Sequence, residues 1–191
     1  MVMTHSLSYE ALAKQLFTPK CLYRIDEITQ AKTLIPKDAG IYAWWFDTLP
    51  ALVPIDGAEK VNEFLLRYIG IAPSGPSSKR TLRDRLQNHC RGPIAISTLR
   101  RALAVLLQQD LSLHIVRLAT RKLALEQDGE HRLTTWMNDH ARVCWAVIPK
   151  PWEFERRLIA AAKPTLNVAG GVHPFAIDLR KLRSSIKNSP A

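Results

Sequence analysis

Five side chains in this sequence have types and positions that suit binding an anion or moving a proton. Tyr42 and Tyr68 each fall inside a short apolar segment. Arg85 and His89 are four residues apart, so on a helix they share one face at a separation of about 6 Å. Glu155 falls in the first turn of a predicted helix, where the helix dipole favours a carboxylate. Each residue has an ordinary structural explanation when taken alone, so only the set is informative.

The set follows a definite order along the chain. Its elements are Gly40-Ile41-Tyr42, Tyr68-Ile69-Gly70, Leu82-x-x-Arg85-Leu86-x-x-His89, Glu155-x-x-Leu158-Ile159 and Lys163-Pro164-x-x-Asn167. In this order they resemble the GIY-YIG nuclease superfamily, which takes its name from the first two tripeptides. The resemblance extends from Gly40 to Asn167. The 26 residues from Tyr42 to Tyr68, together with His89, look most similar to the restriction-endonuclease-like branch.

The resemblance implies an α/β fold in which a small three-stranded sheet is flanked by helices. It also implies a DNA endonuclease that hydrolyses phosphodiester bonds with one divalent metal ion, Mg²⁺ or Mn²⁺. The alternative is a nucleic-acid-binding module on the same fold that does not cut. Matched residue by residue, the implied site is Tyr42, Tyr68, Arg85, His89, Glu155 and Asn167, with Glu155 as the metal ligand.

The chemistry of phosphodiester hydrolysis gives these residue types a use. A planar guanidinium such as that of Arg85 stabilises the charge that grows on the phosphate oxygens in the transition state. A hard oxygen ligand such as Glu155 suits Mg²⁺, which commonly keeps several waters and takes one or two carboxylates. The metal would stabilise the leaving oxygen. Tyr68 and His89 are expected to orient water or phosphate, and Asn167 to bond either the backbone or Glu155.

The sequence leaves the general base open. The resemblance favours Tyr42, but a tyrosine with an ordinary pKa of ~10 needs nearby cations to act as a base. Many relatives carry a lysine directly after the second tripeptide, where this chain has Ile71. One of the cations that follow, Lys79, Arg80 or Arg83, could replace that lysine. Alternatively, His89 is the base.

Positive charge is concentrated in one part of the sequence. The chain has 27 Lys and Arg against 17 Asp and Glu, a formal net charge of +10. Between Lys79 and Arg101, seven cations face the single anion Asp84, so salt bridges within a helix do not account for the run. We therefore predict DNA as the partner, with RNA as the other polyanion that fits. The residues expected to contact it are Lys79, Arg80, Arg83, Arg91, Arg100 and Arg101.

Other features argue against several classes of protein. The longest strongly apolar run, Ala102 to Leu107, is six residues, whereas a membrane-spanning helix needs about 20. The N-terminus lacks the charged and apolar regions of a secretory signal. The three cysteines, Cys21, Cys90 and Cys144, form no Cys-x-x-Cys pair, which argues against a structural zinc site. We expect a cytoplasmic protein with no membrane partner.

Hydrophobic patterning predicts the elements that position the site. Strands are predicted over 41–46, 64–71 and 143–148, with a weaker one over 113–118. Helices are predicted over 6–17, 79–90, 128–140 and 151–163, with a further helix that begins at Ser97 or Thr98 and a short one in the tail.

These elements predict three segments along the chain. They are an N-terminal helical extension over residues 1–36, a nuclease domain over 37–170 and a basic C-terminal tail over 171–191. We also expect a homodimer, which is the simplest way for a nuclease with one site per chain to break both strands of a duplex.

Overall fold

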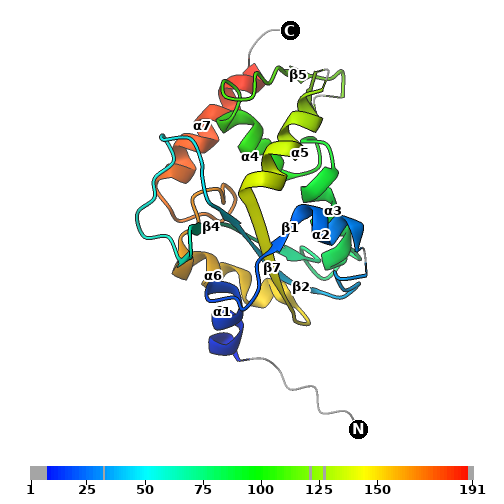
Figure 1. Cartoon of the computed structure of the whole chain (residues 1–191), viewed down its shortest axis with the longest axis vertical. Coiled ribbons are helices and arrows are strands. Elements are labelled where there is room, and N and C mark those ends of the chain that lie inside the picture. The colour runs from blue at the N-terminus through cyan, green and yellow to red at the C-terminus, as the bar shows by residue number, and fades with distance from the viewer. Residues whose placement is uncertain (1–7, 32, 121, 127, 189–191) are drawn as a thin grey trace.

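The computed structural model describes residues 8–31, 33–120, 122–126 and 128–188 (Figure 1). The helices in these ranges are α1 (Tyr9–Phe17), α2 (Ile25–Gln30), α3 (Leu82–Arg91), α4 (Thr98–Leu106), α5 (Gly129–His140), α6 (Glu155–Ala162) and α7 (Phe175–Asn188), with the 3₁₀ helix η1 (Pro151–Glu153). The strands are β1 (Tyr23–Arg24), β2 (Gly40–Phe46), β3 (Lys60–Val61), β4 (Phe64–Ala72), β5 (Ile115–Arg117), β6 (Leu123–Leu125) and β7 (Ala141–Val147).

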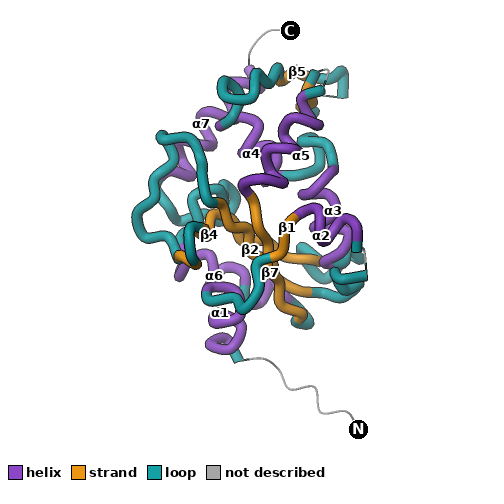
Figure 2. The backbone as a smooth tube through the Cα atoms, in the orientation of Figure 1, coloured by secondary structure: helices purple, strands orange, loops and turns teal. Residues whose placement is uncertain are grey.

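A five-stranded antiparallel sheet in the order β1-β7-β2-β4-β3 forms the centre of the molecule. Figure 2 shows its strands between the helices. The expectation of three strands was wrong: β7, β2 and β4 are the long strands, and β1 and β3 each add two residues at the edges. Strands this short leave no alternating pattern in a sequence. The strand predicted over 113–118 corresponds to β5, which pairs with β6 in a separate sheet.

The long strands are buried on both faces, which explains their nearly continuous apolar sequence. Neighbouring residues of a strand point to opposite faces. Tyr42 and Trp44 therefore belong to the core formed with α3, α4 and α5, whereas Ile41 and Trp45 belong to the core formed with α1 and α6. This alternation turns the tyrosine of the first tripeptide toward α3, the helix that carries the predicted arginine and histidine.

Capping residues explain where two helices begin. α3 begins directly after Thr81, three residues later than predicted, because Thr81 Oγ1 accepts the Asp84 N–H at 3.2 Å and the Asp84 carboxylate accepts the Thr81 N–H at 2.9 Å. α1 is capped by Ser8, whose hydroxyl accepts a backbone N–H; Ser6, the other predicted cap, lies outside the described residues. The helix predicted over 151–163 divides into η1 and α6.

Both terminal segments pack onto the central fold. α1 packs against β7, and β1 extends the sheet. At the other end of the chain, Phe175 and Leu179 of α7 are buried in the core, and α7 packs against α4 near the top of Figure 1. The predicted short tail helix is thus a 14-residue helix that contributes to the core.

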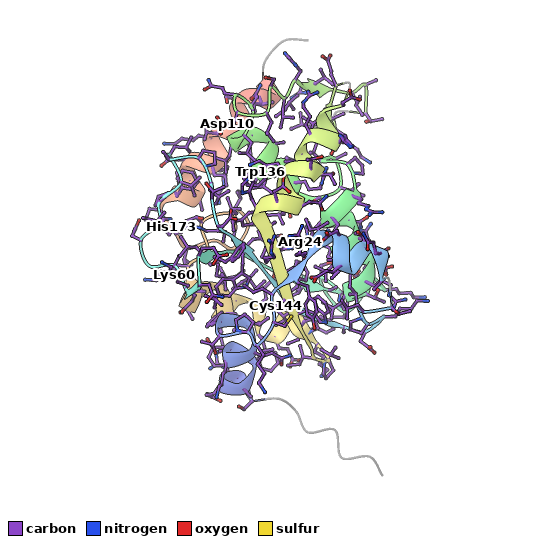
Figure 3. The ribbon with its side chains drawn as sticks, in the orientation of Figure 1. Arg24, Lys60, Asp110, Trp136, Cys144 and His173 are labelled. Carbon is purple, nitrogen blue, oxygen red and sulfur yellow. The ribbon has the colours of Figure 1, made fainter. Side chains whose placement is uncertain are left out.

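The cysteines Cys21, Cys90 and Cys144 are free thiols. Cys90 and Cys144 are buried, and Figure 3 shows Cys144 among the packed side chains around β7. Burial raises the pKa of both thiols to about 12, so they are neutral at pH 7 and act as small core residues. In the part of the chain that the structure describes, no helix is both long enough and apolar enough to cross a bilayer.

Candidate active site

Tyr42 and Tyr68 are brought together by the pairing of β2 with β4. In the antiparallel register Tyr42 is paired with Gly70 and Trp44 with Tyr68, so the tyrosines lie diagonally on one face. Their ring centroids are 6.4 Å apart. A Cβ at Gly70 would collide with the phenol ring of Tyr42. The two tripeptides therefore form one structural unit, in which the glycine of the second makes room for the tyrosine of the first.

Tyr42 is connected through His89 to the beginning of α4. Tyr42 Oη and His89 Nε2 share a hydrogen bond of 2.7 Å, and both side chains are fully buried. His89 Nδ1 and Ser97 Oγ share a second bond of 2.7 Å. Ser97 Oγ also accepts the backbone N–H of Arg100 at 3.1 Å, as the cap of α4. The Ser97 hydroxyl thus caps the N-terminus of α4 and orients the imidazole of His89.

The surroundings of His89 keep its ring neutral at pH 7. Burial, and then the positive charges of Arg85 and Arg100, hold the pKa of His89 well below its usual range. A neutral imidazole has one donor and one acceptor nitrogen. With the proton on Nδ1, the ring donates to Ser97 Oγ, and Nε2 accepts the phenolic proton of Tyr42. This tautomer satisfies both bonds of the ring.

Arg85 lies one turn before His89 on the same face of α3. It is half-buried, and its Nε–H donates to Tyr42 Oη at 3.3 Å. Burial, and then the phenol of Tyr68, raise the pKa of Tyr42 well above its usual range, whereas Arg85 acts in the opposite direction. Arg85 forms no ion pair with any described carboxylate. Its charge is therefore available to an external anion.

Tyr68 is held in place by α4. Its Oη and Thr98 Oγ1 share a hydrogen bond of 2.9 Å. Burial raises the pKa of Tyr68, against the opposing effects of Thr98 and Arg85. Tyr68 is therefore a neutral phenol at pH 7. From the sequence, Ser97 and Thr98 are predicted only as alternative helix caps, and their polarity was the one signal that they could also bond site residues.

Glu155, in the first turn of α6, is half-buried and makes no hydrogen bond or ion pair with another described residue. Burial raises the pKa of its carboxyl group, whereas Arg85 lowers it. The carboxylate in turn raises the pKa values of Tyr42 and Tyr68. These mutual effects mean that Glu155 lies within electrostatic reach of the tyrosine cluster, which we define as Tyr42, Tyr68, Arg85 and His89.

The donor set around Glu155 fits a hard cation that keeps most of its water. Across the described ranges, no group of three or more His, Cys, Asp and Glu side chains gathers at one point. A single carboxylate with no protein partner matches the way Mg²⁺ is commonly held, by one or two carboxylates together with water and substrate phosphate. The residues present are therefore compatible with Mg²⁺ or Mn²⁺ at Glu155.

Asn167 bonds the backbone rather than Glu155. Its Oδ1 accepts the Ile69 N–H at 2.9 Å, and its Nδ2 donates to Ile69 O at 2.8 Å. The preceding residue, Leu166, donates its N–H to Arg67 O at 2.9 Å. Asn167 thus completes the outer edge of β4 beside Tyr68. Its role in this structure is to position the second tripeptide.

The cations predicted to contact nucleic acid lie in different environments. Lys79 and Arg80 are exposed in the segment before α3. Arg83 is half-buried, and its Nε donates to Ile35 O at 2.7 Å. Arg91 is exposed, and its Nη2 donates to a threonine hydroxyl of α2 at 2.8 Å. All four keep their charge at or near the surface around α3.

A small hollow lies against Arg85. It has a volume of about 140 Å³ and is lined by Ile71, Ala72, Ser74, Ser78, Arg80 and Arg85. Ile71 stands where the resemblance implies a lysine, and it supplies no charge. The cations that line this hollow are Arg80 and Arg85. With two guanidinium groups, two hydroxyl groups and no carboxylate in its lining, the hollow suits a phosphate group.

Arg100 does not fit its predicted place on the nucleic-acid surface. Its side chain is fully buried, and its Nη2 lies 2.8 Å from the Glu130 carboxylate. It also donates to Cys90 O and to Glu130 O, each at 3.1 Å. The basic run in the sequence did not reveal that α5, 30 residues away, supplies a carboxylate. Arg100 is therefore a paired core residue rather than a surface cation.

Arg183 on α7 is a charged residue that was not predicted as a site residue. It is half-buried, and its guanidinium is within electrostatic reach of Arg101 and Tyr68. The available signal was its spacing from Leu179, because residues four apart share a helix face and Leu179 is fully buried. The tail was predicted to be basic with a short helix, but nothing in the sequence distinguished Arg183 from the other cations of the tail.

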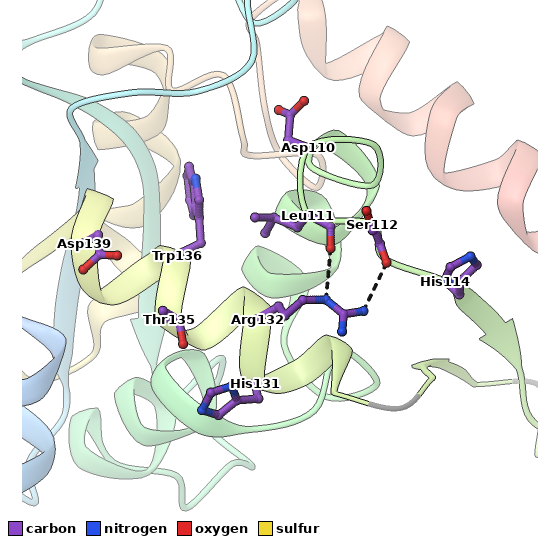
Figure 4. Close-up of a pocket in the computed structure, with 9 residues that line it drawn as sticks. All are labelled: Asp110, Leu111, Ser112, His114, His131, Arg132, Thr135, Trp136 and Asp139. Carbon is purple, nitrogen blue, oxygen red and sulfur yellow. Dashed lines mark hydrogen bonds between the residues drawn. The ribbon is translucent and has the colours of Figure 1, made fainter.

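A larger hollow lies elsewhere, between α5 and the turn before β5. Figure 4 shows its lining, in which Arg132 donates to Leu111 O at 3.0 Å and to Ser112 O at 3.1 Å. The volume is about 780 Å³, but Asp110 and Asp139 line it, and none of the predicted site residues does. Carboxylates disfavour a phosphodiester, so the size of this hollow does not make it the active site.

The comparisons with known proteins agree with this geometry. A family model described as "GIY-YIG catalytic domain" matches residues 40–186, which is well over half of the chain. The match runs past residue 170 and includes most of α7. Neither the curated proteins nor the solved structures gave a match.

Proposed function

The chain belongs to the GIY-YIG family of catalytic domains, and we propose that it is a DNA endonuclease that hydrolyses phosphodiester bonds with Mg²⁺ or Mn²⁺. The observation that carries the proposal is the hydrogen-bonded series from Arg85 through Tyr42 to His89. It brings a cation, a phenol and a neutral imidazole into contact beside a hollow that suits a phosphate group. We also propose that the chain is most similar to the restriction-endonuclease-like branch, on the 26 residues from Tyr42 to Tyr68 together with His89.

Tyr42 is the proposed base, with His89 as the group that accepts its proton. Arg85 donates to Tyr42 Oη, so the phenolic hydrogen points toward His89 Nε2 rather than toward Arg85. The raised pKa of Tyr42 and the lowered pKa of His89 oppose transfer of that proton before the attack. The two proton movements are therefore coupled: as the water oxygen attacks phosphorus, Tyr42 Oη takes a proton from the water and passes its own proton to His89 Nε2, while Arg85 stabilises the charge on Tyr42 Oη. This arrangement dispenses with the lysine that Ile71 replaces.

Arg85 and Arg80 are the proposed ligands of the scissile phosphate. Arg85 stabilises charge that develops in the transition state, and Arg80 holds the phosphate from the exposed side of the hollow. Tyr68 orients the reacting groups from β4, and Asn167 positions that strand. The exposed or half-buried cations Lys79, Arg83, Arg91 and Arg101 would contact DNA phosphates further away.

Glu155 is the residue that would hold the metal ion. When bound, a divalent cation supplies positive charge to the scissile phosphate and to the leaving 3′ oxygen. The half-buried carboxylate has no other partner among the described residues, so it can serve as a ligand without breaking an existing bond.

The test is cleavage of a supercoiled plasmid with Mg²⁺, Mn²⁺ or EDTA. We expect the protein to cut with either metal and not with EDTA. Glu155→Ala should lose cutting while it keeps DNA affinity, and Glu153→Ala is the matched control, because Glu153 is an exposed carboxylate paired with Lys150. Undiminished cutting by Glu155→Ala would contradict the metal assignment. DNA binding without cutting under any of these metals would support the non-catalytic alternative.

We include a homodimer in this proposal, because two copies are the simplest way to break both strands with one site per chain. Light scattering of the protein with and without a DNA duplex measures this directly. Cutting of both strands by a species that is monomeric throughout would contradict it.

A further inference from the structure

Arg101 lies on the side of α4 that faces the tyrosine cluster. Thr98, one turn earlier on α4, holds Tyr68 Oη, and residues three apart share a helix face. The Arg101 guanidinium is half-buried and fixed, because its Nε donates to Ile94 O at 3.2 Å and its Nη2 to Ala95 O at 2.6 Å. These acceptors are neutral carbonyl groups, so they leave the positive charge of Arg101 unbalanced.

Arg183 approaches the same place from α7. This helix packs beside α4 (Figure 1), and Leu179, four residues before Arg183, is fully buried. Burial, and then the charge of Arg101, lower the pKa of Arg183, whereas Tyr68 acts in the opposite direction. Arg183 therefore lies within electrostatic reach of both. It has no hydrogen bond or ion pair with any residue in the described ranges.

Two half-buried guanidinium groups that act on each other without a carboxylate are an unfavourable arrangement for the protein alone. An anion that joins both groups removes the repulsion and satisfies donors that water reaches only partly. Arg183 is within electrostatic reach of Tyr68. Neither Arg101 nor Arg183 lines the hollow that contains Arg80 and Arg85, so the pair is separate from the proposed site of the scissile phosphate.

We propose that Arg101 and Arg183 form a second phosphate site, which binds a neighbouring, uncut phosphate of the DNA strand while Arg85 binds the scissile one. This proposal rests on the proposed nuclease function and deepens it. Contact at two phosphates fixes the direction of the strand across Tyr68, so the pair acts in positioning the substrate rather than in the chemical step.

The first test is binding of a random-sequence DNA duplex in EDTA, measured by fluorescence anisotropy over a series of salt concentrations. Arg183→Ala should weaken binding several-fold and reduce the slope of log K against log salt by about 0.9, the contribution of one phosphate contact. Arg183→Lys should keep most of the slope. The matched control is Lys181→Ala, which removes one charge from α7 at an exposed residue that lies 3.7 Å from Asp178 and should leave the slope unchanged.

The second test changes the DNA instead of the protein. Once a cleavage position is mapped in a duplex, a neutral methylphosphonate replaces one flanking phosphate at a time. At one flanking position the replacement should reduce the DNA affinity of the wild-type protein several-fold. The DNA affinity of Arg183→Ala should not fall further at that position. Because the wild-type protein carries the main effect, this result does not depend on how well a variant folds.

The outcomes separate the two proposals. Equal losses in Arg183→Ala and Lys181→Ala would overturn the phosphate site in favour of diffuse surface charge, and so would methylphosphonate effects that are the same in wild type and Arg183→Ala at every position. A wild-type protein that cuts DNA while Arg183→Ala matches it in binding would overturn the site and leave the nuclease function intact. A wild-type protein that neither binds nor cuts DNA would contradict the proposed function itself.

Discussion

The core beneath α4 and the rim of the tyrosine cluster place arginine in two different settings. In the core, Arg100 is fully buried and its charge is balanced by Glu130 at 2.8 Å. At the rim, Arg85, Arg101 and Arg183 are half-buried and have no carboxylate partner among the described residues. The two settings differ in burial and also in the presence of a counter-ion. In these two settings, the neutralised Arg100 serves the fold, and the unneutralised arginines at the rim are available to a ligand.

Arg85→Ala should give the largest effect at the rim and is the strongest test of this contrast. Loss of a donor that stabilises transition-state charge lowers the rate about 10²–10³-fold. DNA affinity should fall less than tenfold, because the interaction is made mainly in the transition state. Arg85→Lys should stay impaired, since an ammonium group cannot reproduce a planar fork of donors. Single-turnover rates at saturating enzyme measure the effect.

The control for Arg85→Ala is Arg83→Ala, which removes an arginine two residues away on α3. Arg83 is held by Ile35 O rather than by Tyr42, so its loss should act mainly on DNA affinity. If cleavage by Arg83→Ala is slower than cleavage by Arg85→Ala, the assignment of Arg85 as the catalytic cation of α3 is wrong.

Arg100→Ala should show the opposite behaviour. Removing one partner of a buried ion pair commonly costs about 3–5 kcal/mol. Glu130 is partly exposed, so water can solvate its carboxylate, and we expect the free energy of unfolding to fall by about 3 kcal/mol, at the low end of that range. Urea unfolding measures this loss. The salt slope of DNA binding in the folded fraction should not change, and a reduced slope would move Arg100 back to the nucleic-acid surface.

His89 lies between the two regions, since the charges of both Arg85 and Arg100 lower its pKa. Its pKa is lowered in the folded protein, so below the ordinary value of about 6.5 the unfolded chain binds a proton more readily. Stability should therefore be complete above pH ~6.5 and fall by up to about 1.4 kcal/mol per pH unit below it, until the folded-state pKa is reached. Urea unfolding between pH 7.5 and 5 would detect this.

His89→Gln is the control for the pH measurement. Its stability should be lower than that of the wild type at pH 7.5, because the bonds to Tyr42 and Ser97 are disturbed, but the loss between pH 6.5 and 5 should be smaller. Equal slopes in the two proteins would show that another group is responsible for the pH dependence.

The sequence predicted the long elements well because their apolar patterns are continuous. β2, β4 and β7 and most of α3 and α5 lie close to their predicted ranges. The two-residue strands β1 and β3 were missed because their pairing depends on distant partners rather than on local pattern. The family resemblance named Tyr42 and Gly70, but only the register of β2 against β4 explains why a glycine must face that phenol.

The charged residues show where sequence reasoning stops. Arg100 and Arg101 are adjacent in the chain, and nothing in their local sequence separates a core ion pair from an unbalanced charge at the rim. The difference comes from residues on other helices. Glu130 on α5 is 30 residues from Arg100, and Arg183 on α7 is 82 residues from Arg101. Charge counts along a chain therefore locate a basic region but do not identify which of its residues are available to bind a ligand.

The bonds of Asn167 to Ile69 have a consequence for how copies of the chain can associate. An unpaired strand edge is a template on which another chain can add a strand, and such edges lead to aggregation. On the outer side of β4, Asn167 and Leu166 occupy the positions that a foreign strand would take, and β3 covers the beginning of the same edge. A dimer of this protein would therefore not form by joining two sheets at β4.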